Sequence, residues 1–90
     1  MFRKKTILDR YREALAYLDN CGTFNETKFR EFNRITNNQF SEAEIVNQLR
    51  NAQFMMGGME DLKNVLRSTM IEAISTFEKL EREGVDLSSL

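Results

Sequence analysis

Apolar residues recur every three or four positions along residues 59–83, which is the period of one face of an α-helix. The stripe consists of Met59, Leu62, Leu66, Met70, Ala73, Phe77 and Leu80. Gly57 and Gly58 precede it, and Gly84 follows it at a position typical of a helix C-terminus. At 1.5 Å per residue, such a helix would be roughly 37 Å long. We therefore expect it to be the spine of the fold, covered by the rest of the chain.

Shorter helical patterns precede this one and predict helices over residues 4–20, 24–36 and 42–56. Thr23 with Glu26, and Ser41 with Glu44, have the spacing of capping boxes at the starts of the second and third of these helices. The expected fold is therefore all-α. It is a single domain over residues 1–90, a small bundle of about four helices with the long C-terminal helix as its spine.

Two short segments connect and end this arrangement. Gly57 and Gly58 between the third and fourth helices are typical of a tight turn, although a hinge has the same composition. The tail over residues 84–90 is short, and we expect it to pack loosely.

The composition narrows the classes of function. The chain has 90 residues, 41% of them hydrophobic, with no proline, no histidine and one cysteine. The absence of proline favours helices, and one cysteine cannot form an internal disulfide. Without histidine the sequence offers neither a Cys/His nucleophile pair nor an ordinary zinc site. We therefore expect a non-enzymatic, intracellular protein with no transmembrane segment and no cofactor or metal of its own.

Charge is distributed unevenly along the chain. Residues 1–40 carry eight basic and five acidic side chains, a balance of +3, whereas residues 41–90 have a balance of −4. A basic first half indicates an acidic partner, although a solvated surface with chance clustering gives the same pattern.

A nucleic-acid partner is disfavoured. The second and third predicted helices have the order of a helix-turn-helix motif, and the third offers asparagine and glutamine side chains that can contact adenine. However, Glu42 and Glu44 would place two negative charges against the phosphates at the start of the reading helix. The sequence pI of about 5.5 also argues against a general DNA-binding protein.

Three apolar residues fall outside the predicted inward stripes. Phe54 lies on the polar side of the third helix, and Val65 and Ile71 lie off the stripe of the fourth. They predict a second apolar surface, for a partner or for a second copy of the chain. The alternative is that the bundle itself covers the long helix on more than one side.

The first helix resembles the opening of the LYR-motif proteins, a family of small mitochondrial helical proteins. The resemblance lies in the segment 7–15 with Tyr11-Arg12, in Phe32 near the end of the second helix, and in the polar turn that follows it. It covers roughly residues 4 to 60. Arg10 stands where the signature has leucine, and the spacing between Tyr11 and Phe32 is shorter than in the family.

The resemblance implies an accessory subunit or assembly factor of a mitochondrial complex that binds an acidic acyl carrier protein. A basic rim would then contact that partner, through Arg10, Tyr11, Arg12, Lys28, Arg30 and Arg34. The partner's acylated phosphopantetheine chain would enter the bundle along Tyr11, Leu15, Phe29, Phe32 and the methionines. The alternative is a small phage or bacterial regulator or chaperone, located in the cytoplasm, that acts as a dimer or grips a target through Phe54, Val65 and Ile71.

Overall fold

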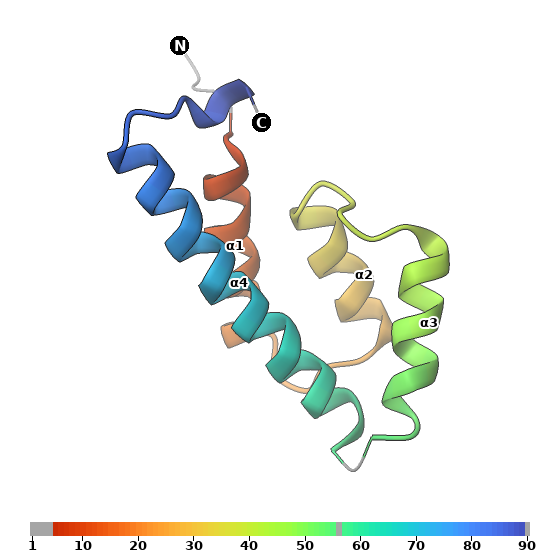
Figure 1. The fold of residues 1–90 in the computed structure, drawn as a ribbon. Coiled ribbons are helices and arrows are strands. Elements are labelled where there is room, and N and C mark those ends of the chain that lie inside the picture. Colours follow the sequence, from red (N-terminus) through yellow and green to blue (C-terminus); the bar gives the residue numbers. More distant parts are fainter. Residues whose placement is uncertain (1–4, 56, 90) are drawn as a thin grey trace.

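The computed structural model describes residues 5–55 and 57–89 and confirms the predicted all-α fold (Figure 1). Within these residues there are four α-helices and one short 3-10 helix. They are α1 (Ile7–Asn20), α2 (Glu26–Ile35), α3 (Glu42–Ala52), α4 (Gly58–Arg82) and η1 (Leu87–Ser89).

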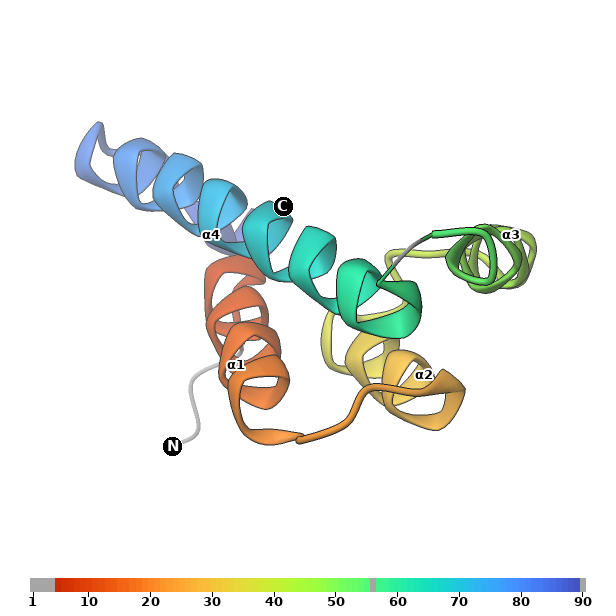
Figure 2. The same ribbon diagram turned by 90° about the horizontal axis from the view of Figure 1, so that it is seen from below.

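The long helix α4 is the spine of the fold, as predicted. Its stripe faces inward, with Leu62, Leu66 and Met70 at most 3% exposed. Helices α1 and α3 both pack against it. Viewed from below, α1 and α2 lie on one side of α4, and α3 lies beside its first turns (Figure 2). The long stripe is therefore covered by separate elements along its length.

The core is shared by all four helices. Phe29 and Phe32 from α2 are fully buried, and they belong to the same cluster as Leu18 of α1, Ile45 of α3 and Leu66 of α4. α2 packs closely against α1, but among the described residues it makes few contacts with α3. Two openings lie between α2 and α3 as a result.

The starts of the helices are fixed by side-chain caps. At α3 the predicted capping box is confirmed, since the Ser41 Oγ accepts from the Glu44 N–H (3.2 Å) and the Glu44 Oε1 accepts from the Ser41 N–H (3.1 Å). Helix α1 has a second capping box, formed by Thr6 and Asp9, so it begins at Ile7 rather than near residue 4.

The predicted capping box at Thr23 and Glu26 is wrong. The Asn25 Oδ1 instead accepts from the Lys28 N–H at 3.0 Å and caps α2. The physical reason is Phe24, which is only 2% exposed. The chain stays extended at Asn25 (φ −152°, ψ −179°), and this places Phe24 in the core before the helix begins.

Helix α3 ends at Ala52, four residues before the predicted end. The N–H groups of Gln53 and Phe54 donate to the carbonyls of Arg50 and Asn51, so the chain tightens into a turn. Residue 56, the predicted end, lies outside the described residues. Gly58 then adopts φ +56°, a conformation that glycine enters without strain, as α4 begins.

The end of α4 confirms the predicted glycine cap, but the prediction of a loose tail is wrong. The Val85 N–H donates to the Leu80 carbonyl (3.0 Å) and the Gly84 N–H to that of Glu81 (3.1 Å), the two bonds of a Schellman motif. Gly84 has φ +89° and turns the chain back toward the bundle. Leu87 is consequently only 3% exposed, and η1 contacts both α1 and α4.

Candidate partner-binding surfaces

Most of the predicted basic rim is occupied by contacts within the chain. The guanidinium of Arg12 on α1 pairs with Glu78 on α4 at 2.8 Å. Arg34 pairs with Glu31 one turn earlier on α2. These charges are therefore locally balanced, and a partner would have to compete with an existing carboxylate at each position.

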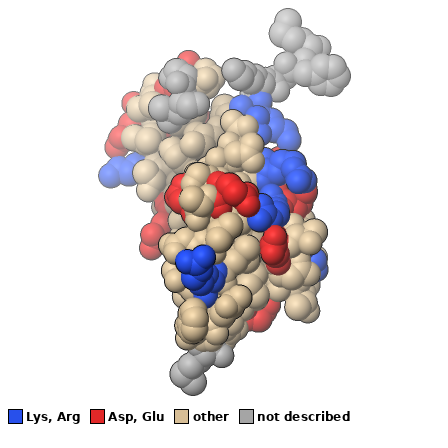
Figure 3. Space-filling model, turned by 90° about the vertical axis from the view of Figure 1, so that its right-hand side faces the viewer, with Lys and Arg blue, Asp and Glu red and all other residues tan. Residues whose placement is uncertain are grey.

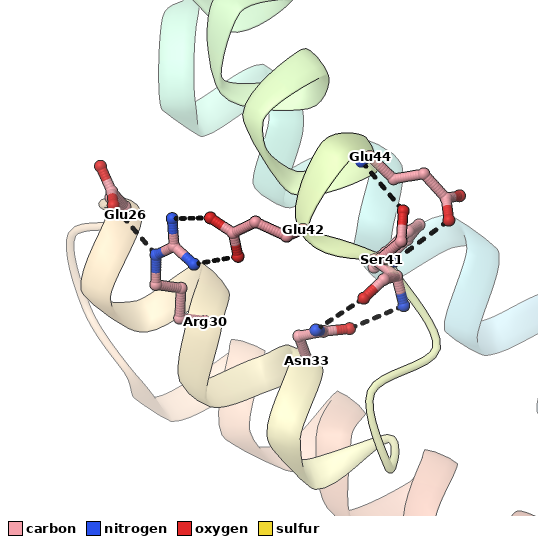
Figure 4. A network of polar contacts seen from close by, with 7 residues as sticks. Glu26, Arg30, Asn33, Ser41, Glu42 and Glu44 are labelled. Atoms are coloured by element: carbon pink, nitrogen blue, oxygen red, sulfur yellow. Dashed lines mark hydrogen bonds and ion pairs between the residues drawn. The ribbon is translucent and has the colours of Figure 1, made fainter.

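Arg30 lies at the centre of a polar network that joins α2 to α3 (Figure 4). It donates to both carboxylate oxygens of Glu42, at 2.8 and 3.0 Å, and to Glu26 at 2.9 Å. Its hydrogen bonds to Glu42 and then to Glu26 raise the pKa of Arg30 above its usual value, and the same bond to Arg30 lowers the pKa of Glu42. Because one guanidinium serves two carboxylates, the cluster keeps a net charge of −1.

Asn33 makes the second connection between these elements. It is 4% exposed, and its amide donates to the Phe40 carbonyl (3.1 Å) and accepts from the Phe40 N–H (2.8 Å). The ring of Phe40 also makes an edge contact with Phe29, with ring centroids 5.7 Å apart. The loop between α2 and α3 is thus tied to the last turns of α2.

Lys28 contacts the C-terminal end of α1 rather than facing solvent as part of a rim. Its ammonium donates to the Cys21 carbonyl at the end of α1, and Lys63 of α4 donates to the neighbouring Gly22 carbonyl at 3.0 Å. Helix α1 has no basic residue in its own last turn. The two lysines therefore supply positive charge from other helices to the negative end of the α1 dipole.

Tyr11 and Arg10 lie at the opposite end of α1. The Tyr11 hydroxyl donates to the Gln39 Oε1 at 2.7 Å, and its ring makes an edge contact with Phe77 of α4. Burial raises the pKa of Tyr11. Arg10 forms no ion pair among the described residues, and with Tyr11 it lines a polar cleft of about 360 Å³ that Lys5 also borders. Within the basic rim, Arg10 is the cation best placed for an external anion.

The predicted apolar patch is exposed but divided. Phe54 is 82%, Val65 54% and Ile71 44% exposed. Val65 and Ile71 are six residues apart on α4, which places them roughly 120° from each other around the helix. They therefore do not share one face.

Phe54 instead extends a stripe of α3 residues that was not predicted as a surface. Val46 is 41% exposed, and a shallow depression of about 720 Å³ is lined by Ala43, Val46 and other α3 residues. The signal was present in the sequence, since Ala43, Val46, Arg50 and Phe54 follow one another at helical steps of 3, 4 and 4. On the side of the molecule that carries α3, uncharged surface separates groups of both signs (Figure 3).

A groove between α2 and α3 was also missed by sequence reasoning. It consists of two adjoining openings of about 560 and 290 Å³, which we call together the α2–α3 groove. Its charged walls come from Glu26, Arg30 and Arg50, and its apolar lining comes from Val46, Leu49, Ala52, Met55 and Met59. The methionines near the glycine pair were the available signal, because methionine is common at adaptable apolar surfaces.

Two features would indicate a metal site or a membrane span, and neither occurs among the described residues. They contain no group of three or more His, Cys, Asp or Glu side chains arranged to hold a metal ion. Among the same residues, no helix has the length and apolar character that crossing a membrane requires. No known protein family, curated protein or solved structure matches this chain.

Proposed function

We propose that this protein is a non-catalytic helical interaction module, and that the α2–α3 groove binds an amphipathic helix of a protein partner. The observation that carries the proposal is a largely apolar groove between α2 and α3, two helices that are not closely packed on each other. Such grooves accept helices whose apolar residues recur at steps of 3 and 4. Met55 and Met59 can adapt to the shape of the bound side chains.

The charges of the groove define the partner further. Arg50 on the α3 wall forms no ion pair among the described residues, whereas the Glu26–Arg30–Glu42 cluster reaches the α2 wall with a net charge of −1. The matching helix would carry an acidic residue on the flank that faces α3 and a basic residue on the flank that faces α2. Such pairs mainly set orientation and the rate of association, and the apolar contacts supply most of the affinity.

The test uses a photo-crosslinking amino acid at position 55, with the same substitution at position 71 as the matched control. The crosslinked segment of the captured protein is identified, synthesised as a peptide and titrated into labelled protein by NMR. We expect amide shifts around Leu49, Gln53 and Gly58, and loss of binding in Met55→Lys but not in Ile71→Lys. Shifts that cluster on another surface, or equal crosslinking from both positions, would refute the groove as the site.

An acyl carrier protein is the second candidate partner. Arg10 supports it, because this half-buried cation, which forms no ion pair among the described residues, borders a cleft next to Tyr11. Arg12 and Arg30 would have to exchange Glu78 and Glu42 for carboxylates of the partner. An acyl chain would also have to displace Phe29 or Phe32 in the core, since both are fully buried.

Native mass spectrometry after mixing with an acylated acyl carrier protein tests this second candidate. We expect a one-to-one complex that Arg10→Glu weakens at least tenfold. Arg82→Glu serves as the matched control, because Arg82 is an exposed arginine of α4 that also forms no ion pair among the described residues. Absence of a complex at about 100 µM of each protein would exclude an affinity useful for an assembly factor.

A further inference from the structure

We propose that the outer face of α3 is a homodimer interface, in which α3 packs antiparallel against α3 of a second copy. This outer face consists of Ala43, Val46, Asn47, Arg50 and Phe54. It shares Val46 and Arg50 with the wall of the α2–α3 groove, whereas Ala43, Asn47 and Phe54 do not line that groove.

The shape of the outer face favours an antiparallel pair. Phe54, at 82% exposed, is the most exposed large hydrophobic residue described, and it lies just past the end of α3. Ala43, the smallest side chain of the stripe, lies near the start of the helix, and Val46 lies between them. In an antiparallel pair related by a two-fold axis, the end of one helix lies beside the start of the other. Each Phe54 ring would then pack over the Ala43 of the second copy.

The charges at the two ends of α3 also favour the antiparallel arrangement. Helix α3 carries Glu42 and Glu44 in its first turn and Arg50 in its last turn. Glu42 is already bound to Arg30, whereas Glu44 only caps its own helix through Ser41. Arg50 has no ion-pair partner among the described residues. The antiparallel arrangement places the last turn of each α3, with Arg50, beside the acidic first turn of the other copy, where Glu44 lies on the flank of the interface. A parallel arrangement would place like charges together.

The area available sets the expected strength. Two buried Phe54 rings contribute roughly 300–500 Å². A stable interface needs about 1,200 Å² or more, so the rest must come from Ala43, Val46, Asn47, Arg50 and their neighbours. An interface at the low end of this range is typical of weak, reversible association, and we expect dissociation in the micromolar range.

Analytical ultracentrifugation from about 1 µM to about 1 mM tests the proposal. The mass should rise with concentration from 10.6 kDa toward twice that value. Ala43→Arg and Phe54→Ser should each raise the dissociation constant at least tenfold, because the first blocks the ring's site and the second removes the ring. Ile71→Ser removes an exposed hydrophobic side chain elsewhere and should leave the dissociation constant unchanged. The groove variant Met55→Lys should leave it unchanged as well.

A charge exchange tests the register. Arg50→Glu should weaken the dimer, and Arg50→Glu combined with Glu44→Arg should restore it, with circular dichroism confirming that each variant is folded. A protein that remains monomeric throughout the concentration range would overturn the proposal. A dimer that Ala43→Arg leaves intact would overturn it equally, since the copies would then associate through another face.

Discussion

Replacing Asn33 by alanine tests the connection that holds the loop between α2 and α3 to the last turns of α2. The substitution removes both hydrogen bonds between the Asn33 amide and the Phe40 backbone, of 2.8 and 3.1 Å. The Phe40 N–H and carbonyl are then left to find water in a partly buried loop. The Asn33 carbonyl keeps its own bonds from Thr36 and Asn38, so the helix end itself is preserved.

The expected cost follows from the two lost bonds. Each contributes about 0.5–1.5 kcal/mol net, so the free energy of unfolding should fall by about 1–3 kcal/mol. The higher helix propensity of alanine offsets up to about 0.7 kcal/mol of this loss. A domain of 90 residues has a stability of roughly 5–13 kcal/mol, so the variant should still fold. Its Tm should fall by roughly 5–20 °C.

Thermal and urea unfolding followed by circular dichroism measure the change. Asn64→Ala is the matched control, because Asn64 is exposed in the interior of α4 and the same side chain is removed there. We expect that control to be neutral or slightly more stable than the wild type. If Asn33→Ala is no less stable than Asn64→Ala, the Asn33–Phe40 bonds contribute nothing net and the reasoning fails.

Three further predictions concern single contacts. Leu87→Ala should lower the free energy of unfolding by about 2–5 kcal/mol, measured in urea, because Leu87 is 3% exposed; a loss below about 0.5 kcal/mol would mean that η1 does not stabilise the fold. Asn38 has φ +59°, so Asn38→Ala should cost about 1 kcal/mol by thermal melting while Asn38→Gly should not, and equal effects would contradict the backbone argument. Arg30 lowers the pKa of Glu42 below the usual glutamate value of 4.5. The stability that this pair contributes is therefore fully present at pH values above 4.5, and it is lost as the pH falls through the lower pKa of Glu42 in the folded protein. NMR titration should show the pKa of Glu42 rising toward 4.5 in Arg30→Ala, and an unchanged titration would count against the ion pair.

Sequence patterns predicted the elements that depend on local chemistry. The stripe of α4, the Ser41 capping box and the Gly84 cap each depend on steps of five positions or fewer between successive residues, so their spacing alone predicts the structure. The same rule, applied to Thr6 and Asp9, would have placed the start of α1 correctly. The cap at α2 was different, because the burial of Phe24 decided between two acceptable capping residues.

The surfaces depended on contacts that sequence spacing does not contain. Arg12 and Glu78 are 66 positions apart, and Arg30 reaches Glu42 across a loop. The basic residues of the first half therefore form separate ion pairs on different parts of the surface and do not make one continuous basic rim. The division of Val65 from Ile71 followed from helical geometry and could have been predicted, whereas the α2–α3 groove required knowing that these two helices are not closely packed.

The pairing of α1 with α4 has a consequence for the order of folding during synthesis. α1 packs most extensively on the last helix of the chain, and the carbonyls at its end are held by Lys28 and Lys63. A ribosome adds about 5–20 residues per second, so α1 emerges several seconds before α4 is complete. During that interval its apolar face lacks its main cover, and an isolated helix of 14 residues is only marginally stable in water. The nascent chain should therefore remain accessible to chaperones until α4 emerges, and then fold in one cooperative step.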